Sequence, residues 1–191
     1  MLRVLAVGAL ALGGVHAVAA QEASPHHTVL RAGAGVASAD YTCAGCTIDA
    51  LTGFTAFLAG TRAMGRVLTV GLETTLSHAT EDQAEVTLLG ALATAGARST
   101  TRVPAWGSLG LGWVWYSGTG PNSNGVALSA RAGIDIPLRP GFAVSPYAGY
   151  LTMLGHDGPR TVVEPIAVPG DPGVATRVAS VQFGLAFTLT P

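Results

Sequence analysis

Apolar and polar residues alternate along most of the chain. The clearest case ends the sequence, where every second position from 179 to 189 is apolar and those between are small or polar. Side chains of a β-strand point alternately to its two faces, so this stretch has one bulky apolar face and one mild face. Capped helical spacing sustained over three turns is not found. The pattern predicts an all-β protein, and the bulky face is formed by Ala179, Val181, Phe183, Leu185, Phe187 and Leu189.

We identify eight runs with this alternation, each a little over ten residues long and followed by a turn sequence. Between the second and third runs and between the sixth and seventh, the links are short ("AMGR", "PLRPG"), and "AGARSTTRVP" is of moderate length. The links at the other ends are longer ("DYTCAGCTID", "ATEDQ", "SGTGPNSN" and a proline-rich stretch, Gly155–Ala175). Short turns at one end and long loops at the other are typical of an up-and-down antiparallel barrel. The predicted strands are Thr28–Ala39, Leu51–Ala63, Arg66–His78, Glu85–Ala95, Pro104–Ser117, Asn124–Pro137, Gly141–Leu154 and Thr176–Thr190.

The mild face of these runs does not resemble a water-facing surface. Charged residues make up 11% of the chain, against about a quarter in ordinary globular proteins, and the mild face is mostly Gly, Ala, Ser and Thr. Small residues suit the interior of a narrow barrel, whereas the bulky apolar face suits lipid. A strand needs about nine to eleven residues to cross a bilayer, and the runs have that length. We therefore predict an eight-stranded transmembrane β-barrel, with the facing of the second and seventh runs left open around Pro146 and Tyr147.

Charged residues follow the same division between faces. Four of them fall on the mild face, and we predict that they form a paired polar network inside the barrel. Arg62 points the other way, but it lies near a short turn, where the cost of an exposed charge falls toward zero. The predicted interior network is Arg31, Glu73, Arg131 and Asp135.

Aromatic residues gather toward the ends of the runs. Amphipathic aromatic rings are enriched where membrane lipid meets water, so we predict two interface belts. The residues assigned to the belts are Trp113, Trp115, Tyr116 and Tyr150 at the loop end, and Trp106, Phe142 and Phe187 at the short-turn end.

The start of the chain has the layout of a secretory signal peptide. Arg3 supplies a positive charge, Val4–Val15 is an apolar run, and the small residues of "AVAA" provide a cleavage site. We expect residues 1–20 to be a signal peptide and residues 21–191 to form one barrel domain outside the cytoplasm.

The two cysteines, Cys43 and Cys46, lie close together in "TCAGCT". A thioredoxin-type motif would need a βαβ context, and a zinc site would need two further ligands nearby. Neither is visible in the sequence. Because the exported protein meets an oxidising compartment, we predict a Cys43–Cys46 disulfide. Because the further ligands are missing, we predict no metal site, and we predict no cofactor.

The pattern as a whole resembles the small eight-stranded outer-membrane barrels of Gram-negative bacteria, the OmpA/OmpX-like group. The terminal alternation carries most of the likeness, because barrels of this group end in such a strand, usually closing on Phe. Pro191 stands here instead of that terminal aromatic residue. The resemblance implies a monomer in the cell outer membrane with lipid around it and four outward loops. Those loops, chiefly the ones at Cys43–Cys46 and Gly155–Ala175, would contact a surface ligand.

Three functions remain to be weighed from the sequence. A filled eight-stranded barrel is too narrow for a wide pore, so a structural or surface-interaction role is favoured. A lipocalin-like soluble barrel binding an apolar ligand is one alternative, although it lacks a charged exterior. A lipid A-modifying barrel enzyme is another, with Ser77–His78 or His156–Asp157 at the rim, but neither pair forms a nucleophile–base–orienter set. The net charge of −1 argues against a nucleic-acid partner.

Overall fold

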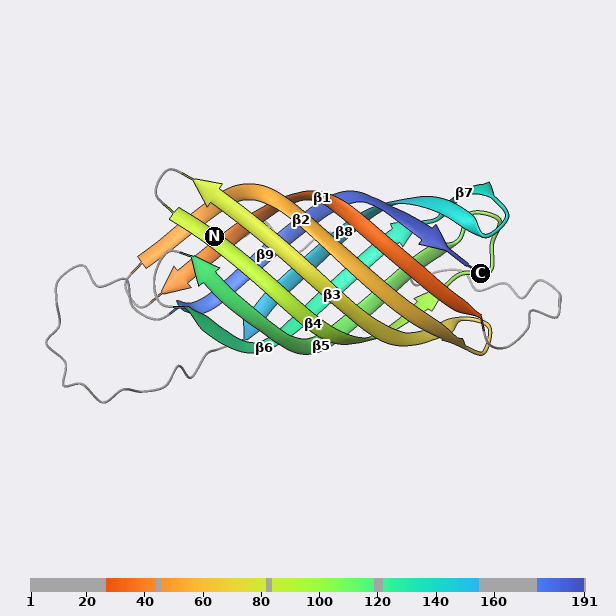
Figure 1. Ribbon diagram of the computed structural model, residues 1–191, viewed down its shortest axis with the longest axis horizontal. Helices are drawn as coiled ribbons and strands as arrows, with labels where there is room; N and C mark the ends of the chain where they lie inside the picture. Colours follow the sequence, from red (N-terminus) through yellow and green to blue (C-terminus); the bar gives the residue numbers. More distant parts are fainter. Residues whose placement is uncertain (1–26, 44–45, 82–83, 119–121, 155–174, 191) are drawn as a thin grey trace, which may run out of the picture.

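The computed structural model describes residues 27–43, 46–81, 84–118, 122–154 and 175–190. These residues form one antiparallel sheet that closes on itself, with the strands strongly tilted to the long axis of the barrel (Figure 1). Within these ranges, no helix has the length and apolar character to cross a bilayer. The strands are β1 (Thr28–Cys43), β2 (Cys46–Met64), β3 (Leu68–Glu81), β4 (Ala84–Arg98), β5 (Ala105–Gly118), β6 (Ser123–Ile134), β7 (Ile136–Arg139), β8 (Phe142–Leu154) and β9 (Ala175–Leu189).

The barrel has eight strands because β6 and β7 are two segments of a single one. Each strand pairs with its neighbours in sequence, β1 pairs with β9, and β6 pairs with both β5 and β8, which closes the sheet. The start of β1 lies beside the end of β9, with Leu30 opposite Leu189. The predicted fold class, an eight-stranded antiparallel up-and-down barrel, is confirmed.

Asp135 separates β6 from β7. The pairing with β8 keeps one register across the break, from Gly133 opposite Tyr147 to Ile136 opposite Val144. Pro146 lies within this interval, and proline has no N–H to donate to a neighbouring strand. The ladder with β8 is therefore interrupted at Pro146, whereas on the side of β5 the Asp135 N–H donates to the carbonyl of Pro104 at 2.8 Å.

The outer face of the barrel is apolar. In β3, the outward residues Leu68, Val70 and Leu72 are 62%, 43% and 70% exposed. Glu73, which follows Leu72 and points inward, is 4% exposed. In β9, the side chains from Val181 to Leu189 at alternate positions are all exposed, whereas Gln182 is buried. The predicted orientation, with bulky groups outward and small or charged groups inward, is confirmed for these strands.

The structure also settles the two strands whose facing the sequence left open. In β2, Phe54 and Leu58 face outward and Phe57 faces inward. In β8, Pro146 is exposed and Tyr147 is 5% exposed, inside the barrel.

Two of the links predicted to be long loops are tight instead. Strands β1 and β2 stay paired through Tyr41 opposite Ile48 as far as Cys43 opposite Cys46, so residues 44–45 form the link. Similarly, β3 and β4 run on to Glu81 and Ala84. Tyr, Thr and Ile favour strands, and the Asp and Gly residues of "DYTCAGCTID" obscured this preference in the sequence. The backbones of Cys43 and Cys46 are partners, but the predicted disulfide and the loop of residues 155–174 lie outside what the structure describes, as do residues 1–26.

Candidate functional site

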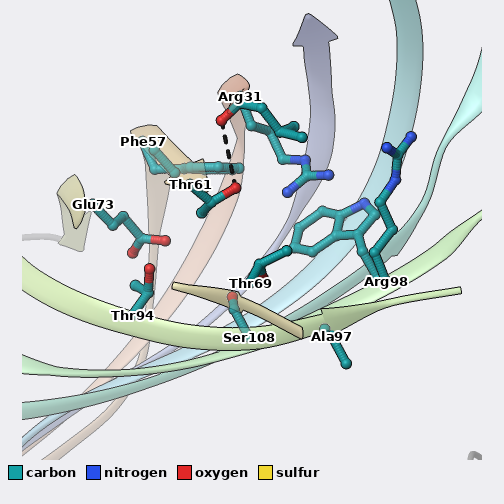
Figure 2. A pocket seen from close by; sticks show the side chains of 13 residues that line it. Arg31, Phe57, Thr61, Thr69, Glu73, Thr94, Ala97, Arg98 and Ser108 are labelled. Atoms are coloured by element: carbon teal, nitrogen blue, oxygen red, sulfur yellow. Dashed lines mark hydrogen bonds between the residues drawn. The ribbon is translucent and has the colours of Figure 1, made fainter. Parts of the chain in front are cut away.

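One arginine and its partners occupy the centre of the barrel interior. Arg131 of β6 is 4% exposed and forms an ion pair with Glu73 of β3. Its Nη2 also donates hydrogen bonds to Thr75 Oγ1 and Gln182 Oε1, each at 2.9 Å. These contacts offset the high cost of burying a charge. Glu73 and Thr94 together line one side of a small pocket beside this ion pair (Figure 2).

Phe57 of β2 packs beneath Arg131. The Arg131 Cζ atom lies 4.4 Å from the centre of the Phe57 ring, a cation–π contact, and the Phe57 and Tyr147 rings meet in a T-shaped contact with centroids 5.0 Å apart. Gly33 of β1 leaves the space that the Phe57 ring fills, because a Cβ at position 33 would lie 2.4 Å from Phe57 Cε1.

We expect Gly33→Ala to destabilise the barrel by about 1–3 kcal/mol, the usual cost of overpacking, because the Phe57 ring must shift away from Arg131. Gly60→Ala is the matched control: its Cβ would point outward and meet Leu30 Cδ2 at an ordinary 3.6 Å. Urea unfolding in lipid vesicles measures both variants. Equal stability of the two would contradict the packing role assigned to Gly33.

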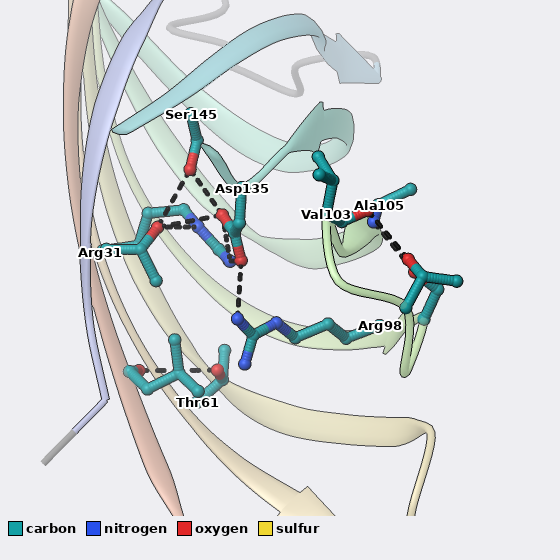
Figure 3. A network of polar contacts seen from close by, with 11 residues as sticks. Arg31, Thr61, Arg98, Val103, Ala105, Asp135 and Ser145 are labelled. Atoms are coloured by element: carbon teal, nitrogen blue, oxygen red, sulfur yellow. Dashed lines mark hydrogen bonds and ion pairs between the residues drawn. The ribbon is translucent and has the colours of Figure 1, made fainter. Parts of the chain in front are cut away.

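A second polar group lies nearer the short-turn end and centres on Asp135, which is fully buried. Figure 3 shows Arg31 and Arg98 converging on its carboxylate, with Ser145 on the other side. The Arg98 Nη2–Asp135 Oδ2 distance is 3.0 Å and the corresponding distance from Arg31 Nη2 is 3.4 Å. Ser145 and Thr188 also donate to Asp135 Oδ1. One carboxylate thus serves two guanidinium groups.

The four charges predicted for the interior all lie there, in two separate groups. Arg131 is with Glu73, and Arg31 is with Asp135. The sequence reasoning missed Arg98, because the fourth predicted strand ended at Ala95. Continuing the alternation of β4 by three residues places Arg98 on the inward face. The other partners that the sequence did not single out are Thr75, Ser145, Gln182 and Thr188.

Five of the seven aromatic residues assigned to interface belts face outward or are partly exposed. Trp113 and Trp115 are 43% and 48% exposed near the loop end. At the short-turn end, Phe142 stacks on Phe187 with centroids 5.8 Å apart. Tyr150 is half-buried. An interface role for these five residues stays a prediction.

Trp106 and Tyr116 are corrections to the belt assignment. They are 6% and 2% exposed and lie inside the barrel. Both occupy even-numbered positions of β5, whereas Trp113 and Trp115 occupy odd-numbered ones, and the period of two separates these sets. Grouping the residues by their distance from a turn ignored this difference. Trp106 stacks on Arg31, whose Cζ lies 3.9 Å from the centre of the indole ring.

The loop end of the interior is filled by apolar side chains, which the sequence analysis did not anticipate. These side chains come from the loop ends of all eight strands, and together they form an apolar plug that closes this end of the barrel. Below the plug, toward the short turns, the interior is polar and holds a cavity of about 20 Å³. The apolar plug consists of Ala39, Leu51, Ala79, Val86, Leu88, Leu92, Val114, Tyr116, Ala127, Leu151, Met153 and Val178.

Ser77 and His78, one of the two rim pairs considered for catalysis, do not form a relay. Ser77 faces inward and bonds to Ser180 at 3.1 Å, whereas His78 lies on the other face. His78 Nδ1 is 2.9 Å from Thr87 Oγ1 and 3.8 Å from Glu85 Oε1, so hydroxyl and carboxylate meet the same ring nitrogen. A catalytic relay needs the hydroxyl and the carboxylate on different nitrogens of the imidazole ring. His156–Asp157 lies outside the described residues, among which no three His, Cys, Asp or Glu side chains group as a metal site.

Comparison with known proteins supports the fold. No protein-family model and no curated protein matches the sequence. Among solved structures, Neisserial surface protein A aligns with a TM-score of 0.60 and 13% identity, over 86% of this chain and 97% of that one. The fold is that of the small eight-stranded outer-membrane barrels. OprG of Pseudomonas aeruginosa is also similar, with a TM-score of 0.47 and 12% identity over 86% of this chain and 96% of that one. Ail of Yersinia pestis aligns with a TM-score of 0.41 and 14% identity over 86% of this chain and 99% of that one.

Proposed function

We propose that this protein is an integral barrel of the bacterial outer membrane that is sealed rather than porous and acts through the surface it presents at its loop end. The single observation that carries the proposal is the distribution of side chains: the outer face of the barrel is apolar, and the charged side chains lie inside it. Leu72 and Leu109 are 70% and 69% exposed, whereas Arg131 and Asp135 are 4% and 0% exposed. A soluble barrel of this construction would expose a large apolar patch to water, which monomeric soluble proteins rarely do.

The filled interior supports a structural or surface-interaction role over the alternatives. A lipocalin-like function needs a pocket of about 300–1,000 Å³ for an apolar ligand. The interior cavity lined by described residues has a volume of about 20 Å³. A wide diffusion pore is opposed by the apolar plug at the loop end, and we assign no catalytic activity because Ser77 and His78, the rim pair within the described residues, form no relay.

The remaining parts of the proposal follow from the barrel's membrane setting. Residues 1–20 would serve as a signal peptide for export, and the exported barrel, 21–191, would function as a monomer, since closure leaves no free strand edge. A Cys43–Cys46 disulfide would clamp the β1–β2 hairpin. Any ligand would be met by the loops at the end that carries this hairpin, with 155–174 as the longest.

Membrane fractionation combined with a heat-mobility test examines this proposal. We expect the protein, expressed in a Gram-negative host, to stay with the outer membrane after carbonate washing. In detergent it should run at different apparent sizes boiled and unboiled, because a closed barrel resists SDS until heated. Release by carbonate together with identical mobility would favour the soluble lipocalin-like alternative and overturn the proposal.

A further inference from the structure

The polar half of the interior carries one positive charge more than its carboxylates balance. Among the described inward-facing residues there are three arginines, Arg31, Arg98 and Arg131, and two carboxylates, Glu73 and Asp135. Glu73 pairs with Arg131, so Asp135 alone faces two guanidinium groups. An uncompensated charge inside a protein is costly, and proteins usually supply a counter-charge.

The cavity beside these arginines is lined by hydrogen-bond donors that have no partner. Trp106 Nε1, Arg98 Nε and Thr94 Oγ1 are all buried, and none of the three bonds to another described residue. Trp106 and Thr94 are 6% and 7% exposed as whole residues. A buried donor without a partner is rare in folded proteins and calls for an explanation. The indole N–H and the guanidinium N–H can only donate, so the missing group must accept.

The cavity is the right size for one small occupant. Its volume of about 20 Å³ exceeds the roughly 10–15 Å³ that a single water-sized species needs. Figure 2 shows Glu73 and Thr94 on one side of the cavity and Arg98 on the other. Glu73 is already neutralised by Arg131, so the part of the wall that lacks a counter-charge is the part formed by Arg31 and Arg98.

An approach to the cavity lies at the short-turn end. A wider pocket of about 190 Å³ is located there, and it shares Thr69 and Arg98 with the inner cavity. Arg66 also lines this outer pocket, whereas no Asp or Glu does. Arg98 therefore lies between the two spaces, and its side chain is 23% exposed. The approach is positively charged along its described walls.

From this geometry we propose that the barrel interior binds a single halide-sized anion, chloride under ordinary conditions, between Arg98 and Trp106, on the side of the cavity away from Glu73. The anion accepts hydrogen bonds from the unpaired N–H groups of Arg98 and Trp106 and supplies the missing negative charge. It enters from the short-turn end, because the apolar plug closes the other end. This inference does not depend on what the loops contact, and it assigns the interior an occupant that the proposed surface role does not require.

Bromide is the probe that tests the proposal, with Trp106 as the reporter. The chain has three tryptophans, and the other two, Trp113 and Trp115, face outward near the loop end. In the Trp113→Phe/Trp115→Phe protein, we expect bromide to quench Trp106 fluorescence along a saturating curve that chloride reverses. Quenching that rises linearly without saturation, or none, means that the cavity holds water alone and overturns the proposal.

A matched pair of arginine variants locates the site. Arg98→Gln should weaken bromide binding by about tenfold or more, the scale of losing one charge-assisted hydrogen bond. Arg102→Gln, at an exposed position four residues further on, should leave binding within about twofold. Equal affinity in both variants contradicts the assigned position. If the tryptophan variant fails to fold, bromide anomalous scattering from crystals of the unaltered protein decides the matter: a peak beside Arg98 supports the site and its absence refutes it.

Discussion

Glu73→Gln is expected to destabilise the barrel by about 3–5 kcal/mol, because it leaves the Arg131 guanidinium charged in the interior without a counter-ion. Arg131 is 4% exposed, so water cannot replace the lost carboxylate. Thr75 and Gln182 still accept hydrogen bonds from Arg131, but neither carries charge. The free energy of unfolding in lipid vesicles, measured by urea titration, gives the effect directly.

Glu81→Gln is the control for this prediction. Glu81 belongs to the same strand, β3, but it is exposed at the loop end, and the same chemical change there should stay within about 0.5 kcal/mol. Adding Arg131→Met to Glu73→Gln removes the stranded charge and should recover part of the loss, since an apolar pair can replace a buried ion pair. If the double variant is less stable than Glu73→Gln alone, the ion-pair account is wrong.

Leu72→Arg is expected to cost about 2–4 kcal/mol, because it places a charge in the middle of the lipid-facing surface. Leu72 is 70% exposed and lies midway among the outward positions of β3 from Leu68 to Leu76, which are apolar except for Thr74. Exposure alone would make the substitution harmless in a water-soluble protein. The fraction of protein that inserts into lipid vesicles, and its unfolding free energy there, measure the cost.

Thr80→Arg is the comparison, since Thr80 is an outward residue of the same strand at its loop end, where the cost should fall to about 0–1 kcal/mol. Thr75 would be unsuitable, because it is 1% exposed and faces the interior. Equal tolerance of arginine at positions 72 and 80 would mean that no lipid surrounds this face.

Alternation with a period of two predicted the eight strands and the facing of the four charges assigned to the interior. Leu72 and Glu73 are neighbours with opposite environments, and no other regular element separates adjacent residues in this way. Where the alternation was broken, the sequence did not determine which residues face the interior of the barrel. Pro146 and Tyr147 are both bulky, and only the pairing of β8 with its neighbours shows that the ring of Tyr147 points inward.

The interior contacts depended on information that a single strand does not contain. Arg131 and Glu73 are 58 residues apart, and the barrel's closure and stagger determine that they meet. The apolar plug was missed for a related reason. Leu88 and Leu151 lie on different strands, and only the closed sheet brings the inward apolar residues of all the strands together at the loop end.

The division of the interior into an apolar loop half and a polar turn half has a consequence for the cell. The buried apolar side chains at the loop end oppose the passage of ions and hydrated solutes through the interior. In the outer membrane that we propose for this barrel, many copies would therefore leave the permeability barrier intact, and planar-bilayer recordings should show no steady current even when the loops are altered.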